Sequence, residues 1–140
     1  VKNLAVSGTD ACQADLKAIR DAKADAVIAN YGLNDAYGAN GQPRYSLDAY
    51  AACLAAIDAA ARDAGSVLVL LAANPTLPSP GWDAGRIDAY NQVKRQTGAY
   101  YCAQPSLRWT AAELPDGQHP TEAAKPAIAA ALAACIRSAL

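Results

Sequence analysis

Apolar and polar positions follow two different spacings along the chain. Short apolar runs, typical of β-strands, occupy residues 2–6, 26–30, 66–72 and 99–103. Segments whose apolar residues have helical spacing follow these runs, at residues 10–23, 46–64, 84–97 and 121–138. Strands that alternate with helices predict a parallel sheet covered by helices on both faces.

Residues at the ends of these segments agree with this prediction. Ser46 is suited to cap the helix that follows it, and Gly65 and Gly98 are suited to end helices. The run at 66–72 is apolar nearly throughout, as in a strand that is buried on both faces. We therefore expect an α/β fold in the form of a three-layer α/β/α sandwich.

Length and composition favour a single globular domain without a surface for nucleic acid or membrane. The chain has 140 residues, of which 53% are hydrophobic, and this is enough for one domain with a substantial core. Its formal net charge is −1, and no run of Lys or Arg offers a surface for nucleic acid or anionic lipid. The longest apolar run, at 67–73, is far too short to span a bilayer.

The cysteines leave two states open. Cys12, Cys53, Cys102 and Cys135 are widely spaced and lack the close pairs of ligands that a zinc site requires. An even number of cysteines permits disulfides, and these favour a periplasmic or extracellular protein. Buried free thiols are the alternative, because cysteine is among the most buried residue types.

The segments at the carboxyl ends of the strands are the candidate functional regions, because ligands of parallel α/β sheets bind there. Gly8 leads from the first strand into a helix, where a backbone N–H is suited to bind an anion; a tight turn also explains a glycine there. Asn34 follows the second strand and is suited to donate to an oxyanion; Gly, Asn and Asp are also common in ordinary turns.

The only histidine lies in the last of these regions. His119 follows Asp116 by three residues, with Gly117 between them and Pro120 after them. This spacing lets the carboxylate accept a hydrogen bond from one imidazole nitrogen while the other faces the cleft, as in a catalytic triad. A helix cap with an incidental histidine is the alternative for this motif alone.

Taken together, these regions resemble the SGNH (GDSL-type) hydrolases, a family with short sequence blocks on a flavodoxin-like α/β fold. Asn-Leu-Ala-Val-Ser-Gly at 3–8 resembles the second block of the family. Tyr-Gly-Leu-Asn-Asp at 31–35 resembles the third block, and Leu-Pro-Asp-Gly-Gln-His at 114–119 resembles the fifth. The blocks occur in the family's order and span essentially the whole chain.

The resemblance implies a serine ester hydrolase (an esterase, acetylesterase or lipase-like enzyme) that needs no metal or organic cofactor. It implies that Gly8 and Asn34 provide the oxyanion hole. It also implies that Asp116 and His119 are the acid and the base of the catalytic triad. The expected substrate is a small-molecule or carbohydrate ester.

The first block of the family, Gly-Asp-Ser, is absent from the chain. Its serine is the nucleophile, and none of the serines present lies in a matching turn; these are Ser7, Ser46, Ser66, Ser79, Ser106 and Ser138. The resemblance places the missing block on a central strand, between the strands expected at 2–6 and 26–30. Omitting a central strand would cost more than the ~5–15 kcal/mol that stabilises a typical domain.

We therefore expect residues 1–140 to form one SGNH-like domain that is incomplete at its N-terminus. A companion N-terminal peptide that carries Gly-Asp-Ser is expected to complete it. A non-catalytic carbohydrate- or acyl-binding domain that has lost the nucleophile is the alternative. Tyr37, Tyr45 and Trp82 flank the expected cleft, where they either contact the substrate or cover the edge of the core.

Overall fold

Helices and strands alternate in the computed structural model, which describes residues 2–38, 40–74, 76–77, 81, 83–103, 110 and 112–140. In chain order the elements are η1 (Ala11–Gln13, a 3₁₀ helix), α1 (Leu16–Ala22), β1 (Ala26–Ala29), α2 (Leu33–Ala36), α3 (Leu47–Asp63), β2 (Val67–Leu71), α4 (Ala84–Gln96), β3 (Tyr100–Cys102) and α5 (Lys125–Ala139). The strand order is β1-β2-β3, and both pairs are parallel, with Ala26 opposite Val67 and Val69 opposite Tyr100. The predicted α/β fold with a parallel sheet is confirmed.

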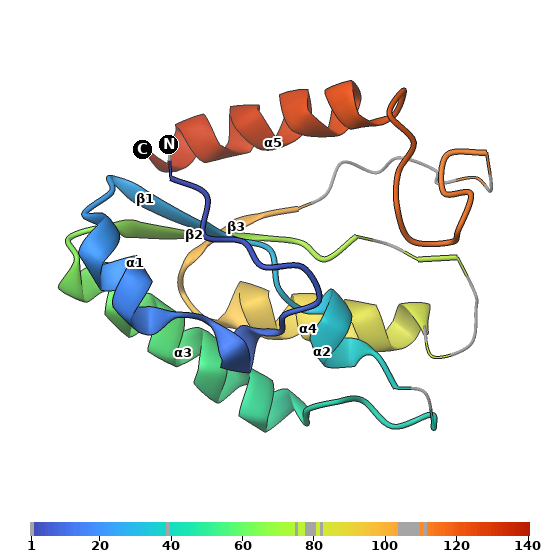
Figure 1. The fold of residues 1–140 in the computed structure, drawn as a ribbon, viewed down its shortest axis with the longest axis horizontal. Coiled ribbons are helices and arrows are strands. Elements are labelled where there is room, and N and C mark those ends of the chain that lie inside the picture. Colours follow the sequence, from blue (N-terminus) through green and yellow to red (C-terminus); the bar gives the residue numbers. More distant parts are fainter. Residues whose placement is uncertain are drawn as a thin grey trace.

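The sheet lies between two layers of helices, with α1, α3 and α4 on one face and α5 on the other (Figure 1). Successive side chains of a strand point to opposite faces of the sheet. In β2, Leu68 and Leu70 accordingly pack into the main core, whereas Val69 and Leu71 belong to a smaller core under α5. The apolar run of the sequence therefore corresponds to a strand that is buried on both faces.

Helix α3 supplies much of the main core. Its buried residues recur every three or four positions and so line one face of the helix; they are Tyr50, Leu54, Ile57, Ala60 and Ala61. Burying a large apolar side chain contributes about 1.5–3 kcal/mol. Ser46 caps the helix as predicted, because its Oγ accepts a hydrogen bond from Ala49 N at 3.2 Å.

The prediction of a strand at residues 2–6 is wrong for this structure. Leu4 and Val6 are 40% and 66% exposed. The backbone of the segment bonds locally, with Ala5 N donating to Asn3 Oδ1 at 3.0 Å. A strand requires a neighbour that shares its backbone hydrogen bonds, and none of the described strands pairs with this segment.

The helix predicted at residues 10–23 is divided into η1 and α1. Ala14 lies between the two and leaves the helical region, with φ −59° and ψ 133°. The Asp15 carboxylate then accepts a hydrogen bond from Ala18 N at 2.8 Å and begins α1 as its N-cap. The division follows because an N-cap residue does not itself have helical backbone angles.

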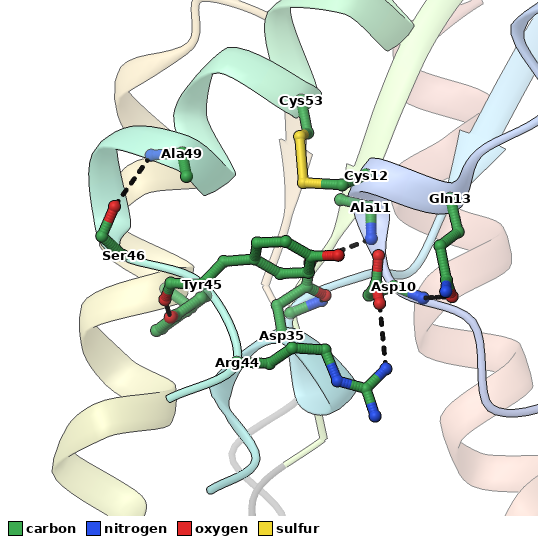
Figure 2. The surroundings of a disulfide bond; sticks show 12 residues. Asp10, Ala11, Cys12, Gln13, Asp35, Arg44, Tyr45, Ser46, Ala49 and Cys53 are labelled. Carbon is green, nitrogen blue, oxygen red and sulfur yellow. Dashed lines mark hydrogen bonds and ion pairs between the residues drawn. A yellow bond between two sulfur atoms is a disulfide. The ribbon is translucent and has the colours of Figure 1, made fainter. Parts of the chain in front are cut away.

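All four cysteines form disulfides, so the alternative of free thiols is wrong. Cys12–Cys53 joins η1 to α3 (Figure 2), and Cys102–Cys135 joins β3 to α5. Disulfides persist in oxidising compartments, and these two bonds favour such a location for the protein.

Helix α5 depends on its disulfide more than α3 does. No residue of α5 is fully buried. Its inner side chains are half-buried and pack on Val69, Leu71 and Cys102. In contrast, α3 has residues with no exposed surface. In α5, the disulfide therefore takes the place of part of the apolar contact that a helix such as α3 makes with the core.

Removal of Cys102–Cys135 is expected to loosen α5, whereas removal of Cys12–Cys53 is expected to leave α3 on the sheet. The bonds have sequence separations of 33 and 41, so loop entropy gives about 4 kcal/mol for either one, and the difference comes from packing. Amide hydrogen exchange in the two paired Cys→Ala variants measures this difference. Equal protection of α5 in both variants would contradict the expectation.

Candidate active site

The predicted site residues follow strands whose carboxyl ends lie at one edge of the sheet. The strands β1, β2 and β3 are parallel, so the segments that leave them start on the same side (Figure 1). Asn34 lies in α2, directly after β1. Asp116 and His119 lie in the segment between β3 and α5.

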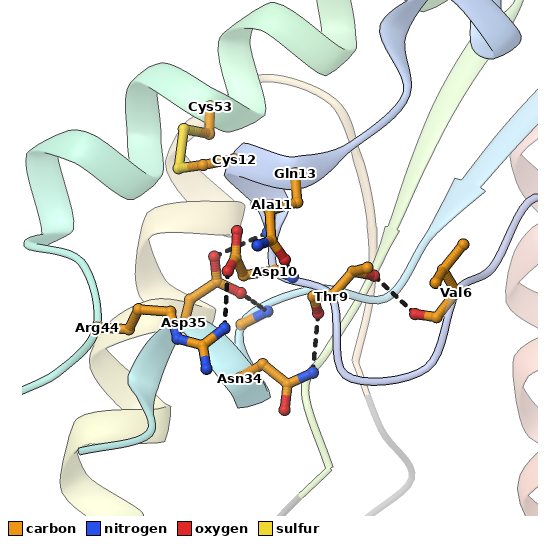
Figure 3. Close-up of polar contacts among 11 residues, drawn as sticks. Val6, Thr9, Asp10, Ala11, Cys12, Gln13, Asn34, Asp35, Arg44 and Cys53 are labelled. Atoms are coloured by element: carbon orange, nitrogen blue, oxygen red, sulfur yellow. Dashed lines mark hydrogen bonds and ion pairs between the residues drawn. A yellow bond between two sulfur atoms is a disulfide. The ribbon is translucent and has the colours of Figure 1, made fainter. Parts of the chain in front are cut away.

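Asn34 contacts the turn that contains Gly8. Its Nδ2 donates to Thr9 O at 2.8 Å (Figure 3). Thr9 closes the turn, because its Oγ1 donates to Val6 O at 2.7 Å. Gly8 has φ +76°, a conformation that favours glycine. The structure thus brings Asn34 and the Gly8 turn together, and one proton of the Asn34 amide remains for another acceptor.

Asp35, the neighbour of Asn34, links two segments through its carboxylate. Oδ1 accepts from Ala11 N, and Oδ2 accepts from Gly32 N, each at 2.9 Å. Asp35 is fully buried, and burial raises its pKa, while the two N–H donors act in the opposite direction. The ionised carboxylate can accept at both oxygens, whereas the protonated form carries a donor on one. The ionised form therefore fits this arrangement.

A second buried carboxylate lies beside this one. Asp10 has no exposed surface, and its Oδ2 accepts from Arg44 Nη1 at 2.9 Å (Figure 3). The backbone of Arg44 is held as well, since Arg44 N and Tyr45 N donate to Asp35 O at 3.1 and 3.4 Å. The Arg44 side chain thus binds the Asp10 carboxylate, while the backbone of Arg44 and Tyr45 binds the main-chain carbonyl of Asp35, and both contacts fix the loop after α2.

Helix α4 supplies buried polar side chains to the end of β2. Asn91 Oδ1 accepts from Ala73 N at 2.8 Å, and Lys94 Nζ donates to Leu71 O at 2.6 Å. Residues three apart share one face of a helix, so both side chains reach the same strand end. Neither residue was predicted, because each fits the helical pattern of residues 84–97 and only its tertiary partner reveals its role.

Two further side chains of α4 hold the loop between α2 and α3. Arg86 donates to Ala36 O at 3.0 Å and to Gly41 O at 2.7 Å. The Tyr90 hydroxyl donates to Tyr45 O. Helix α4 therefore fixes the segments that follow both β1 and β2.

The aromatic residues predicted to flank the cleft differ in their surroundings. Tyr37 lies against Gly81, where an added Cβ would be 2.5 Å from the tyrosine ring. Tyr45 is half-buried, and its carbonyl accepts from Tyr90. Trp82 lies outside the described residues. The Tyr37 contact is of the kind expected for an aromatic residue that packs on a neighbouring loop.

Asp116 orients His119 through both of its oxygens. Oδ2 lies 2.6 Å from His119 Nδ1, and Oδ1 accepts from His119 N at 2.7 Å and from Gln118 N at 2.9 Å. The backbone N–H of His119, followed by its ring and the N–H of Gln118, lowers the pKa of Asp116 well below its ordinary value. The His119 side chain is 76% exposed, which leaves its other ring nitrogen accessible.

The Asp116–His119 pair and the Gly8–Asn34 pair form two separate groups. Within the described residues, no hydrogen bond joins one group to the other. Leu77 N donates to Gly117 O at 2.8 Å and so ties the segment after β2 to the histidine loop. The two groups thus share a sheet edge while each is organised by its own hydrogen bonds.

The described part of the chain offers no group of three or more His, Cys, Asp or Glu side chains that could hold a metal ion. None of its helices is long and apolar enough to cross a bilayer.

The α/β fold is shared with solved structures of other proteins. No family model and no curated protein matches the chain. Similar solved structures include TesA, at 22% identity and a TM-score of 0.67 over 99% of this chain and 78% of that chain. Another is a mutant of Axe2, an acetyl-xylooligosaccharide esterase from Geobacillus Stearmophilus, at 21% identity and a TM-score of 0.69 over 93% of this chain and 68% of that chain. These likenesses support the α/β fold with a parallel sheet.

The histidine loop is expected to loosen in acid. An acid whose pKa is lowered on folding stabilises the fold fully above its ordinary pKa, here 3.8, and this contribution is lost as the pH falls below that value. Amide protection factors of Gln118 and His119 should therefore decrease from about pH 4 downwards. Asp116→Asn has no such carboxyl group and should show no such decrease. Constant protection of both amides in the unmodified protein down to about pH 2 would contradict this expectation.

Proposed function

We propose that the chain is the larger part of an SGNH-type serine ester hydrolase. His119 is its general base, Asp116 orients that base, and an upstream segment contributes the nucleophilic serine. The observation that carries the proposal is the 2.6 Å contact between Asp116 Oδ2 and His119 Nδ1. An imidazole held by a carboxylate at one nitrogen and open at the other is suited to general base catalysis.

The placement of Asp116 favours this role over that of a helix cap. Helix α5 begins at Lys125, and its N-cap residue is Ala124. Asp116 lies well before that end and directs all three of its hydrogen bonds to Gln118 and His119. The carboxylate therefore serves the local loop and the histidine ring.

Gly8 and Asn34 are proposed to stabilise the oxyanion. The Asn34 amide is fixed by Thr9 O through one proton, and its second proton is available for the substrate. The Gly8 N–H makes no hydrogen bond to the described residues and lies in an exposed turn. Each such donor contributes roughly 3–4 kcal/mol to transition-state stabilisation in comparable sites.

The free edge of β1 is the proposed place for the upstream strand. Among the described strands, β1 pairs only with β2. Ile28 is 50% exposed, although its neighbours Val27 and Ala29 pack into the main core. Since side chains alternate along a strand, Ile28 points to the face that carries α5. An added parallel strand would cover this residue and would end at the same edge as the candidate site.

The proposed reaction proceeds through an acyl-enzyme. His119 accepts the proton of the serine hydroxyl as the serine oxygen attacks the acyl carbonyl, and then gives that proton to the departing alcohol. Water, deprotonated by His119, then attacks the acyl carbonyl; the bond between the acyl group and the serine oxygen breaks, and His119 gives the proton to that oxygen, which releases the acid and restores the serine. Asp116 stabilises the imidazolium formed in both steps.

We propose a short acyl ester of a small molecule or carbohydrate as the substrate. The support is the fold shared with Axe2, whose name describes an acetyl-xylooligosaccharide esterase. We also propose a periplasmic or extracellular location, because the two disulfides favour an oxidising compartment.

Labelling with a fluorophosphonate tests the source of the nucleophile. In protein purified from the organism that encodes it, the label is expected on a serine that lies upstream of these 140 residues. Peptide mass spectrometry under reducing conditions locates the modified residue. A label on Ser7 would refute the upstream serine, and no label at all would favour the non-catalytic binding domain.

His119→Ala is expected to reduce kcat for a short acyl ester by about 10³-fold or more, because the serine loses its base. The overall fold should persist, since the His119 side chain is 76% exposed. Steady-state kinetics and circular dichroism measure the two effects.

Gln118→Ala is the matched control for this variant. The Gln118 contact to Asp116 is made by the backbone N–H, which alanine retains. Activity should therefore remain close to that of the unmodified enzyme. Unchanged turnover in His119→Ala would remove His119 from the mechanism.

A further inference from the structure

Lys94 is buried directly beneath the turn that begins α2. The residue has no exposed surface, and its Nζ donates to Leu71 O at 2.6 Å. A Cβ added to Gly32 would lie 3.3 Å from both Cε and Nζ of Lys94 and 3.0 Å from the Tyr50 hydroxyl. The lysine therefore fills the space under Gly32, and this close approach leaves little room for a larger residue there.

The hydrogen bond to Leu71 does not by itself explain a lysine at this position. A neutral donor could bind the same carbonyl without the cost of burying a charge. A buried cation is favoured where an anion lies near it, and the acid of this turn is Asp35. Gly32 connects the two groups, since its N–H donates to Asp35 Oδ2 at 2.9 Å and its Cα side faces Lys94.

The charges around this turn fall into two sets. Arg44 is bonded to Asp10, and no salt bridge to Asp35 is formed within the described residues. Among the buried residues that the structure describes, Lys94 is the only basic one. Lys94 and the Tyr50 hydroxyl of α3 both lie directly under Gly32, the residue whose N–H donates to Asp35.

The ionisation of these groups agrees with this geometry. Burial lowers the pKa of Lys94 to about 7, and attraction to Asp35 acts in the opposite direction. Burial, aided by the nearby charge of Asp10, raises the pKa of Asp35. Burial also raises the pKa of Tyr50, which keeps that hydroxyl neutral. Attraction between opposite charges is mutual, so the lysine charge also favours the ionised carboxylate.

We propose that Lys94 is a positioning residue of the active site. Its charge keeps Asp35 ionised, and the ionised carboxylate holds together the turn that contains Gly8 and the turn that begins α2. The catalytic consequence rests on the proposed function, whereas the pairing of Lys94 with Asp35 does not. When the lysine charge is removed, Asp35 takes up a proton more readily and loses an acceptor for one of its two N–H partners.

Lys94→Gln and Lys94→Met test the pairing. Both remove the charge, and glutamine keeps a donor for Leu71 O if the methionine variant does not fold. The NMR signal of the Asp35 carboxyl carbon, followed against pH with both disulfides intact, reports its ionisation. Its midpoint should move to higher pH, and the amide signals of Ala11 and Gly32 should change with the same midpoint.

Lys17→Met is the matched control, because it changes an exposed lysine on α1. It should leave the Asp35 midpoint where it is. An unmoved midpoint in the Lys94 variants would overturn the proposal. A moved midpoint with unchanged amide signals of Ala11 and Gly32 would also overturn it, because the carboxylate would then not hold the turns.

Kinetics of the protein completed by its upstream serine test the catalytic consequence. Lys94→Gln should lower kcat by about tenfold or more at acid pH with little change in KM, and the acid limb of the pH profile should move to higher pH. A loss of kcat that is the same at every pH would overturn the positioning role. If the completed unmodified protein hydrolyses no ester, the proposed function fails, and the NMR titration still decides the pairing.

Discussion

The candidate site depends on a single carboxylate that is shielded from water. Asp35 accepts from Ala11 N and Gly32 N at equal distances of 2.9 Å, although these two groups are 21 residues apart in the sequence. Because one rigid group contacts both, the relative position of the two segments is fixed by the carboxylate geometry. The contact of Asn34 with Thr9 follows from this, as each residue is adjacent to one of the segments.

A buried charge destabilises the fold. Two helices that make different kinds of contact, α3 and α4, offset this cost. Removing a carboxylate from water costs several kcal/mol unless hydrogen bonds and opposite charge compensate. Helix α3 contributes apolar burial, with five buried residues along one face. Helix α4 instead contributes polar contacts to backbone groups, through Arg86, Tyr90, Asn91 and Lys94. The apolar burial along α3 thus offsets the free-energy cost of the polar groups that are buried around the site.

The sequence predicts correctly those features that depend on the spacing between residues close together in the chain. The buried strand at 66–72, the Ser46 cap and the short-range pairing of Asp116 with His119 each depend on residues a few positions apart. Lys94 and Asp35 were not recognised, because their partners lie 23 and 24 residues away in the chain. The disulfide connectivity stayed open for the same reason, since only the fold decides which cysteines meet. The prediction of a strand at 2–6 is wrong because a strand also requires a neighbouring strand that shares its backbone hydrogen bonds.

Under the proposed function, the upstream strand explains two features: residues 2–6 do not form the predicted strand, and β1 has an unpaired edge. Residues 2–6 carry an apolar pattern, yet Leu4 and Val6 are exposed, and so is Ile28 on β1. Exposed apolar strands at a sheet edge promote unwanted association, so proteins cover such edges. A strand added at β1 would cover Ile28 and give the 2–6 segment a partner. If that strand also carries the serine, completion of the sheet and completion of the catalytic triad are the same event. The enzyme would then be inactive whenever its core is incomplete.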